Sequence, residues 1–391
     1  MPWKVVNIMD QKAQFISLAL ARIKPIKNLC KDFGISRQTG YKWLGRVNNS
    51  TDIFDALKER SKKPNNSPNR TCDNIENIFI KLRKEYPYWG ARKLMILAKE
   101  RYIQVQAPSE RTINRILKRN NLFTNKSPIG TAFNNTFEYK NPNDLWQIDY
   151  KGEFRYGSSK RYCYPLDIID DHSRYNILLD AHQQISTEEV KNSLTKTFKK
   201  YGLPEKMLMD HGSVWYSAHG HIHWTKLTVW LMQLNIDLIY SGVRHPQTQG
   251  KIERFHRTLK NDCIKRNTFN SIQEIQKIFN QFRFEYNHVR PHESLDLQRP
   301  VQKYTPSTKK FPKNIKGPEY PQEAEVVKLT SAGTLHYKGK YRFISEALAN
   351  HYVMIRNYDE FLDIFYYKTL IKHINLKEGA TNVSAMSWHN L

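Results

Sequence analysis

The stretch Leu145-Trp146-Gln147-Ile148-Asp149-Tyr150 decides the class of fold. Its alternation of side chains predicts a β-strand with apolar residues on one face, and Asp149 falls on the opposite face. An isolated acid here stands where a strand would carry a buried or half-buried hydrophobe. Because an unpaired buried carboxylate is costly unless it binds a metal or another cation, the strand predicts a sheet and a cation site together.

The segments that follow this strand predict a mixed sheet covered by helices. Two further strands flank a turn at residues 170–173, and helices and strands then alternate. Three antiparallel strands followed by such an alternation describe a ribonuclease-H-like α/β core with a mixed five-stranded sheet, which we place at residues 144–305. The other expected elements are strands at 161–169, 175–183, 206–210 and 236–240, helices ending near 201 and 234, and a long helix beginning near Thr248.

Residues 1–60 predict an all-α DNA-binding unit. Three helical patterns occur there, and Gly34 makes the turn before Ser36, a natural N-cap for the third helix. Helix, glycine-containing turn and helix is the helix-turn-helix pattern, whose second helix enters the major groove. A small structural bundle is the alternative. The candidate DNA contacts are Arg37, Gln38, Lys42 and Arg46, while Tyr41 and Trp43 are expected to pack.

A second helix-turn-helix-like unit is expected at residues 73–122, with linkers at 61–72 and 123–143. Its last helix has a basic face that includes Arg111 and Arg115. Residues 319–376 have short strand patterns separated by turns, which predict a small all-β, SH3-like barrel. Residues 377–391 are expected to be a tail.

The composition favours a nucleic-acid partner. Sixty-two Lys and Arg residues against 37 Asp and Glu residues give a formal net charge of +25, and the surplus is concentrated in the first third of the chain. A polyanionic partner accounts for such an imbalance better than folding does. The four cysteines are far apart and form no CxxC pair, which argues against a zinc module. We expect no membrane span and a cytoplasmic location.

Three acids stand out by their placement in these expected elements. Asp149 lies on a strand, Asp210 ends a strand and Glu253 lies on the long helix. Ligand sites of α/β sheets gather at strand ends, and hard divalent cations prefer oxygen ligands. Two Mg²⁺ ions held by these acids, with Mn²⁺ as a substitute, would suit phosphoryl transfer.

The helix of Glu253 also carries a basic row that fits a phosphate backbone. Helical spacing places Gln249, Glu253, His256, Arg257 and Lys260 on one side. An exposed helix with ordinary Glu–Arg pairs is the alternative reading. The full set of expected DNA contacts in this region is His245, Gln249, Lys251, Arg254, His256, Arg257 and Lys260.

The run from His245 to Lys260 (HPQTQGKIERFHRTLK) resembles the third-acid motif of DDE transposases from bacterial insertion sequences, members of the retroviral-integrase superfamily. The resemblance extends to Trp146–Asp149, to Leu166–Arg174 (LDIIDDHSR) and to residues 286–292, and it includes the residue 34–43 pattern of the first unit. It therefore covers nearly the whole chain.

The resemblance implies that Asp149, Asp210 and Glu253 are the catalytic, metal-binding triad. The spacing between the second and third acids is longer than is usual, and we place an insertion at residues 216–225. His211 follows Asp210 where such enzymes typically carry Asn, and it could replace a contact around the metal ligands. Asp170 and Asp171 are expected to be turn residues.

These features together predict a transposase that binds the terminal inverted repeats of an insertion sequence. It would cleave and join DNA strands, acting on double-stranded repeat and target DNA as a homodimer or larger assembly in a bacterial, nucleoid-associated location. The alternatives are a catalytically inactive DNA-binding regulator derived from such a transposase, and a nuclease or integrase of another mobile element. The two N-terminal units favour the insertion-sequence enzyme.

Overall fold

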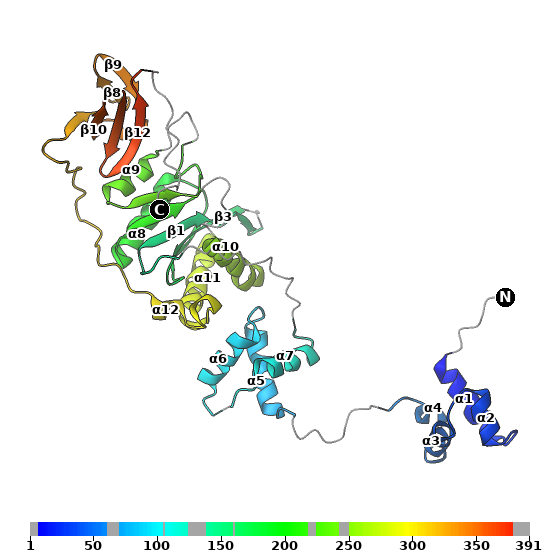
Figure 1. The fold of residues 1–391 in the computed structure, drawn as a ribbon. Coiled ribbons are helices and arrows are strands. Elements are labelled where there is room, and N and C mark those ends of the chain that lie inside the picture. The colour runs from blue at the N-terminus through cyan, green and yellow to red at the C-terminus, as the bar shows by residue number, and fades with distance from the viewer. Residues whose placement is uncertain are drawn as a thin grey trace. The chain divides into compact units, whose positions relative to one another are not determined.

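The computed structural model describes residues 7–60, 70–104, 106–123, 138–158, 161–217, 224–241 and 250–377. The chain divides into two compact units, Met1–Arg70 and Thr71–Leu391. Figure 1 shows helices in the first unit and a mixed α/β arrangement in the second.

The first unit is all-α, as expected. Ser36 caps α3 by accepting a hydrogen bond from the backbone N–H of Thr39 at 3.1 Å, and Gly34 makes the preceding turn with φ +63°. Trp43 is buried in the unit's core, as expected. Tyr41 was also expected to pack, but it is 59% exposed. The helices are α1 (Ile8–Leu20), α2 (Ile26–Asp32), α3 (Arg37–Asn48) and α4 (Ile53–Ala56).

The second unit begins with three helices around their own apolar core. Phe79, Trp89 and Leu94 are buried there, and Ser109 caps the last helix by accepting from Thr112 N–H at 3.3 Å. These helices are α5 (Asp73–Glu85), α6 (Ala91–Arg101) and α7 (Glu110–Arg119).

The central sheet is mixed and has six strands, one more than expected. β4 pairs with β3 and β3 with β1, both antiparallel, while β1–β5 and β5–β6 are parallel. The additional strand β2 pairs with the first residues of β3 and is too short to show a period in the sequence. The strands are β1 (Leu145–Tyr150), β2 (Phe154–Tyr156), β3 (Arg161–Asp170), β4 (Asn176–His182), β5 (Lys206–Met209) and β6 (Asp237–Tyr240).

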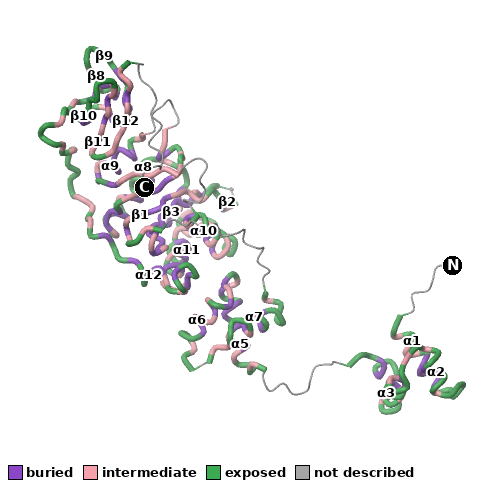
Figure 2. Tube along the Cα trace, viewed as in Figure 1, coloured by how far each residue is buried: buried purple, intermediate pink, exposed green. Residues whose placement is uncertain are grey.

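Helices cover both faces of this sheet, so strands β1, β3, β4 and β5 are buried along most of their length (Figure 2). Trp146 and Ile148 face a core shared with α8 (Thr187–Tyr201) and α9 (Lys226–Gln233). The opposite face packs Ile169 and Leu179 against α10 (Gly250–Thr258) and α11 (Ile272–Phe284). Ser186 caps α8 by accepting from Glu189 N–H. Asp149, with its side chain opposite to that of Ile148, therefore faces the layer that contains α10.

Short helical turns continue the two helices of that layer. A π-helical segment η2 (Leu259–Cys263) and a 3-10 turn η3 (Ile264–Arg266) extend α10, and η4 (Glu285–Val289) extends α11. The segment ends with η5 (Glu293–Leu295) and α12 (Pro300–Lys303).

The C-terminal region is all-β, but its described strands form two sheets and not one closed barrel. A four-stranded antiparallel sheet has the order β12-β11-β10-β7, and β8 and β9 form a separate hairpin followed by η6 (Glu346–Leu348). All six strands lie within residues 319–376, where strands were expected. The strands are β7 (Glu325–Lys328), β8 (Thr334–Tyr337), β9 (Lys340–Phe343), β10 (Tyr352–Tyr358), β11 (Phe361–Tyr366) and β12 (Thr369–Asn375).

Among the described residues, no helix combines the length and the apolar character that a membrane span requires.

Candidate active site

Asp149 and Asp210 lie at corresponding ends of two neighbouring parallel strands. Asp149 is the fifth residue of β1, and Asp210 directly follows β5, which pairs with β1 in parallel from Leu145 opposite Lys206 onward. This carboxyl edge is where α/β sheets usually carry their ligand sites. The sheet therefore brings together two of the three acids that the sequence singled out.

The surroundings of Asp149 disfavour its charged form. Burial, followed by the carboxylates of Asp167 and Asp210, raises the pKa of Asp149 to about 7, although His256 acts in the opposite direction. The backbone N–H of Tyr150 donates to Asp149 Oδ1 at 2.8 Å. The side chain of Asp149 remains 18% exposed, so it can still be reached by a ligand.

Glu253 lies in the first turn of α10 and is exposed. Within the described part of the chain, no three Asp, Glu, His or Cys side chains lie close enough together to hold a metal ion. The three acids are thus not assembled into a ready-made site in this structure.

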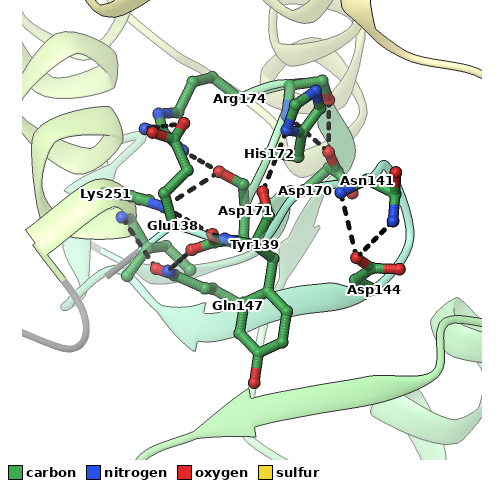
Figure 3. A network of polar contacts seen from close by, with 12 residues as sticks. Glu138, Tyr139, Asn141, Asp144, Gln147, Asp170, Asp171, His172, Arg174 and Lys251 are labelled. Atoms are coloured by element: carbon green, nitrogen blue, oxygen red, sulfur yellow. Dashed lines mark hydrogen bonds and ion pairs between the residues drawn. The ribbon is translucent and has the colours of Figure 1, made fainter. Parts of the chain in front are cut away.

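A buried network fixes the beginning of α10 to the sheet (Figure 3). Lys251 donates to Asp171 Oδ2 at 2.5 Å and to the carbonyl of Asp171 at 3.2 Å. Gln147 bridges both elements, because its Nε2 donates to Asp171 Oδ1 at 2.8 Å and its Oε1 accepts from Ile252 N–H at 3.3 Å. Asp171 is 2% exposed and Lys251 is 13% exposed. We call these three side chains, Gln147, Asp171 and Lys251, the α10 latch.

His256 lies one turn after Glu253 and points towards the sheet. Its Nε2 is 2.7 Å from Asp167 Oδ1, and its Nδ1 is 3.9 Å from Asp149 Oδ2. Burial lowers the pKa of His256, but the carboxylates of Asp167 and Asp149 outweigh burial and the net shift is upward. Both ring nitrogens thus face carboxylates of the protein.

The remaining expected DNA contacts differ in their exposure. Arg254, Arg257 and Lys260 on the α10 layer are exposed, in contrast to Lys251 and His256. His245 and Gln249 lie outside the described residues. In the helical units Arg46 is half-buried against Trp43, with its guanidinium 4.5 Å from the ring centroid. The exposed residues there are Arg37, Gln38, Lys42, Arg111 and Arg115.

His211 is exposed beside Asp210 and contacts aromatic rings. Its ring centroid is 4.5 Å from that of Tyr216 and 5.8 Å from that of Tyr240. The backbone N–H of Gly212, and not His211, donates to Asp210 Oδ1 at 2.9 Å. The insertion expected at residues 216–225 lies partly outside the described residues, which omit 218–223.

Two further motif residues serve the scaffold. Asp170 is buried and accepts hydrogen bonds from Asn143 N–H and Ser173 N–H, each at 2.7 Å, which agrees with a turn residue. Asn287 clamps strand β4, since its side chain exchanges two hydrogen bonds with the backbone of Asn176 at 2.8 and 2.9 Å. Sequence reasoning did not assign Asn287 this role.

Sequence reasoning also missed Asp167, although a signal was available. Asp167 is an acid flanked by Leu166 and Ile168 in an apolar strand, the same kind of placement that identified Asp149. Its position directly opposite Asp149 in the β1–β3 pairing could not be read from the sequence.

The donor set around Asp149 fits a hard divalent cation. Asp149, Asp210 and Glu253 offer carboxylate oxygens, which Mg²⁺ and Mn²⁺ prefer. Asp167 Oδ2 is buried without a hydrogen-bond partner, and burial together with the neighbouring carboxylates raises the pKa of Asp149. A cation at this edge would relieve that concentration of negative charge.

Comparison with known proteins agrees with this arrangement. Two family models, both described as integrase core domain, match residues 140–246 and 234–300. An insertion element IS476 protein of 39.2 kDa from Xanthomonas euvesicatoria is 24% identical over 221 residues, 56% of this chain and 57% of that protein. The transposase for transposon Tn552 from Staphylococcus aureus is 24% identical over 283 residues, 65% of this chain and 56% of that protein. The chain thus spans somewhat more than half the length of these relatives.

Solved structures of retroviral integrases are also similar to parts of the chain. The catalytic core domain of HTLV-2 integrase in complex with magnesium has a TM-score of 0.33 at 15% identity, covering 42% of this chain and 98% of that one. A simian T-cell lymphotropic virus intasome chain has a TM-score of 0.38 at 15% identity, covering 74% and 96%. Because these scores are below 0.5, the class of fold follows from the strand order and the family models.

Residues 140–300 are therefore an integrase core domain with a ribonuclease-H-like sheet. The chain is thus similar, over this domain, to proteins with an integrase core, among them an insertion element protein and the transposase of a transposon.

Proposed function

We propose that this protein is an active transposase that binds the terminal inverted repeats of an insertion sequence and performs DNA strand cleavage and strand transfer. The observation that carries the proposal is the pair of carboxylates, Asp149 and Asp210, at the ends of adjacent parallel strands in an integrase core domain. The carboxyl edge of the strands, where these two acids lie, is the usual place for a ligand site in α/β sheets.

Asp149, Asp210 and Glu253 would hold two Mg²⁺ ions, or Mn²⁺ in their place. When bound, such ions activate the attacking oxygen and stabilise the leaving oxygen of an in-line phosphoryl transfer. Glu253 completes the set when its exposed side chain turns towards Asp149 and Asp210, since the start of α10 is already fixed to β1 and the three acids are not gathered in this structure. We assign that reorientation of the side chain to the binding of cation and DNA.

The exposed cations would hold the DNA. Arg254, Arg257 and Lys260 lie on the same helical layer as Glu253 and would contact the phosphates near the reacting bond. Arg37, Gln38 and Lys42, with Arg111 and Arg115, would recognise the repeat as parts of two helix-turn-helix units. Because the two ends of the element must be handled together, we propose a homodimer or a larger assembly on DNA.

The test is strand transfer on a labelled duplex that carries the element's own terminal repeat. We expect wild-type protein to join ends with Mg²⁺ or Mn²⁺ and not with EDTA, and we expect Asp149→Asn to abolish joining while the repeat is still bound.

A catalytically inactive regulator is the second candidate, and it is favoured by His211, which follows Asp210 where such enzymes typically carry Asn. Tight, salt-sensitive binding of the repeat without cleavage in any divalent metal would support this candidate. His211→Asn would then be the first variant to examine, because His211 lies next to Asp210.

A further inference from the structure

Asp167 is a carboxylate in the middle of the protein interior. It is 0% exposed, it lies between the fully buried Leu166 and Ile168, and its Oδ2 has no hydrogen-bond partner. Burying such a group costs free energy unless it is well paired, so an apolar side chain would serve the fold alone better. Its presence therefore points to a role other than stability.

The pairing of β1 with β3 places Asp167 directly opposite Asp149. Side chains at opposed positions of an antiparallel pair lie on the same face and close together, and like charges there repel. The two strands thus hold the carboxylates of Asp149 and Asp167 side by side on one face of the sheet, at the point where the cation is expected.

His256 lies between these two carboxylates. Its Nε2 is at hydrogen-bond distance from Asp167 Oδ1, 2.7 Å, and its Nδ1 faces Asp149 Oδ2 at 3.9 Å. The ring is only 15% exposed, so it has little freedom to turn outwards. A histidine held on one nitrogen by a carboxylate has a fixed ring orientation, as in the outer shells of metal sites.

We infer that Asp167 and His256 form a positioning pair that orients Asp149 and sets the separation between β1 and α10. Through His256 the pair connects the strand of Asp149 to the helix that carries Glu253 three residues earlier. The α10 latch fixes the beginning of the same helix to the turn after β3, and the pair fixes its second turn. The inference rests on the proposed function in so far as Asp149 and Glu253 share a metal site.

The chain offers a matched control. His373 and Asp363 also form a histidine–carboxylate pair, with Nδ1 at 2.5 Å from Oδ1, but they lie on β12 and β11 of the C-terminal sheet. His373→Gln removes the same kind of interaction without touching the candidate site.

The experiment compares the full-length wild type with Asp167→Asn, His256→Gln, the double variant and His373→Gln. Mn²⁺ affinity is measured by titration calorimetry without DNA, repeat binding by fluorescence anisotropy in EDTA, and the joining rate with saturating Mn²⁺. Amide hydrogen exchange of peptides from β1 and α10 is measured in EDTA.

We expect either single variant to weaken Mn²⁺ affinity by about tenfold or more and to speed exchange across β1 and α10. Repeat binding should stay within about twofold, and the double variant should be no worse than the poorer single variant, because the two residues act as one unit. His373→Gln should match the wild type in every assay of the core.

Wild-type Mn²⁺ affinity and unchanged exchange in both single variants would overturn the positioning pair. Failure of the proposed function gives a different result, in which the wild type joins no ends while the exchange data still separate the variants from the control. If Asp167→Asn does not fold, His256→Gln decides, because His256 is partly exposed whereas Asp167 is fully buried.

Discussion

At Asp149 the protein holds a charge that burial and two neighbouring carboxylates oppose. Such an arrangement trades stability for a site that binds a cation, as active sites commonly do. We therefore expect Asp149→Asn to raise the free energy of unfolding of the metal-free protein by roughly 1–3 kcal/mol above pH 7. Chemical denaturation in EDTA measures this, and a variant less stable than the wild type would show that Asp149 is mainly a structural residue.

His292 predicts how stability depends on pH. It is buried with its Nε2 against the carbonyl of Tyr286 at 3.2 Å, and burial lowers its pKa to about 3. Between pH 6.5 and 3 the unfolded chain therefore binds a proton that the folded protein does not, so stability falls as the pH is lowered through this window.

From pH 7.5 to pH 5 we expect His292 to contribute a loss of about 2 kcal/mol. Urea unfolding at both pH values measures it. His292→Gln should reduce the pH dependence, whereas the exposed His336→Gln should not. An equal pH dependence in wild type and His292→Gln would contradict this assignment.

At the scale of elements, the question for α10 is whether Lys251 holds the helix to the sheet or contacts DNA. As part of the α10 latch, Lys251 should be equivalent to its partner Asp171. We expect Lys251→Met and Asp171→Asn each to lower the joining rate at least about tenfold, because Glu253 loses its position, with little change in repeat affinity.

The matched control for the latch is Lys260→Met, which removes an exposed cation from the segment that extends α10. It should weaken DNA binding and reduce its salt dependence. If Lys251→Met behaved like Lys260→Met while Asp171→Asn had no effect, Lys251 would be a DNA contact and not part of a latch.

Individual elements show which features could be predicted from the sequence and which could not. The cap at Ser36 could be predicted because its hydrogen bond to Thr39 N–H is local. Helical spacing put His256 on the same side as Glu253, but it could not tell that the ring packs against Asp167 on another element. Strand β2 has three residues, too few for a period, and the pairing of β7 with β10 joins strands that are not consecutive in the chain.

For the whole molecule, the net charge of +25 predicts binding dominated by phosphate contacts. The double variant Arg111→Ala/Arg115→Ala should lower the affinity for the repeat. It should also reduce the slope of log K against log salt concentration by an amount that corresponds to about two released counterions. Fluorescence anisotropy at several salt concentrations measures both quantities. An unchanged slope would show that the helices α5, α6 and α7 are not part of the DNA-binding surface.

The most direct test of the central claim compares Asp149→Asn, Asp210→Asn and Glu253→Gln in the strand-transfer assay with Mg²⁺. Glu188→Gln serves as the control, since Glu188 is an exposed acid on α8. We predict that each of the three variants loses more than about 100-fold in joining rate with repeat binding intact, while the control joins at the wild-type rate. A Glu253→Gln variant that joins DNA ends as fast as the wild type would contradict the three-carboxylate site.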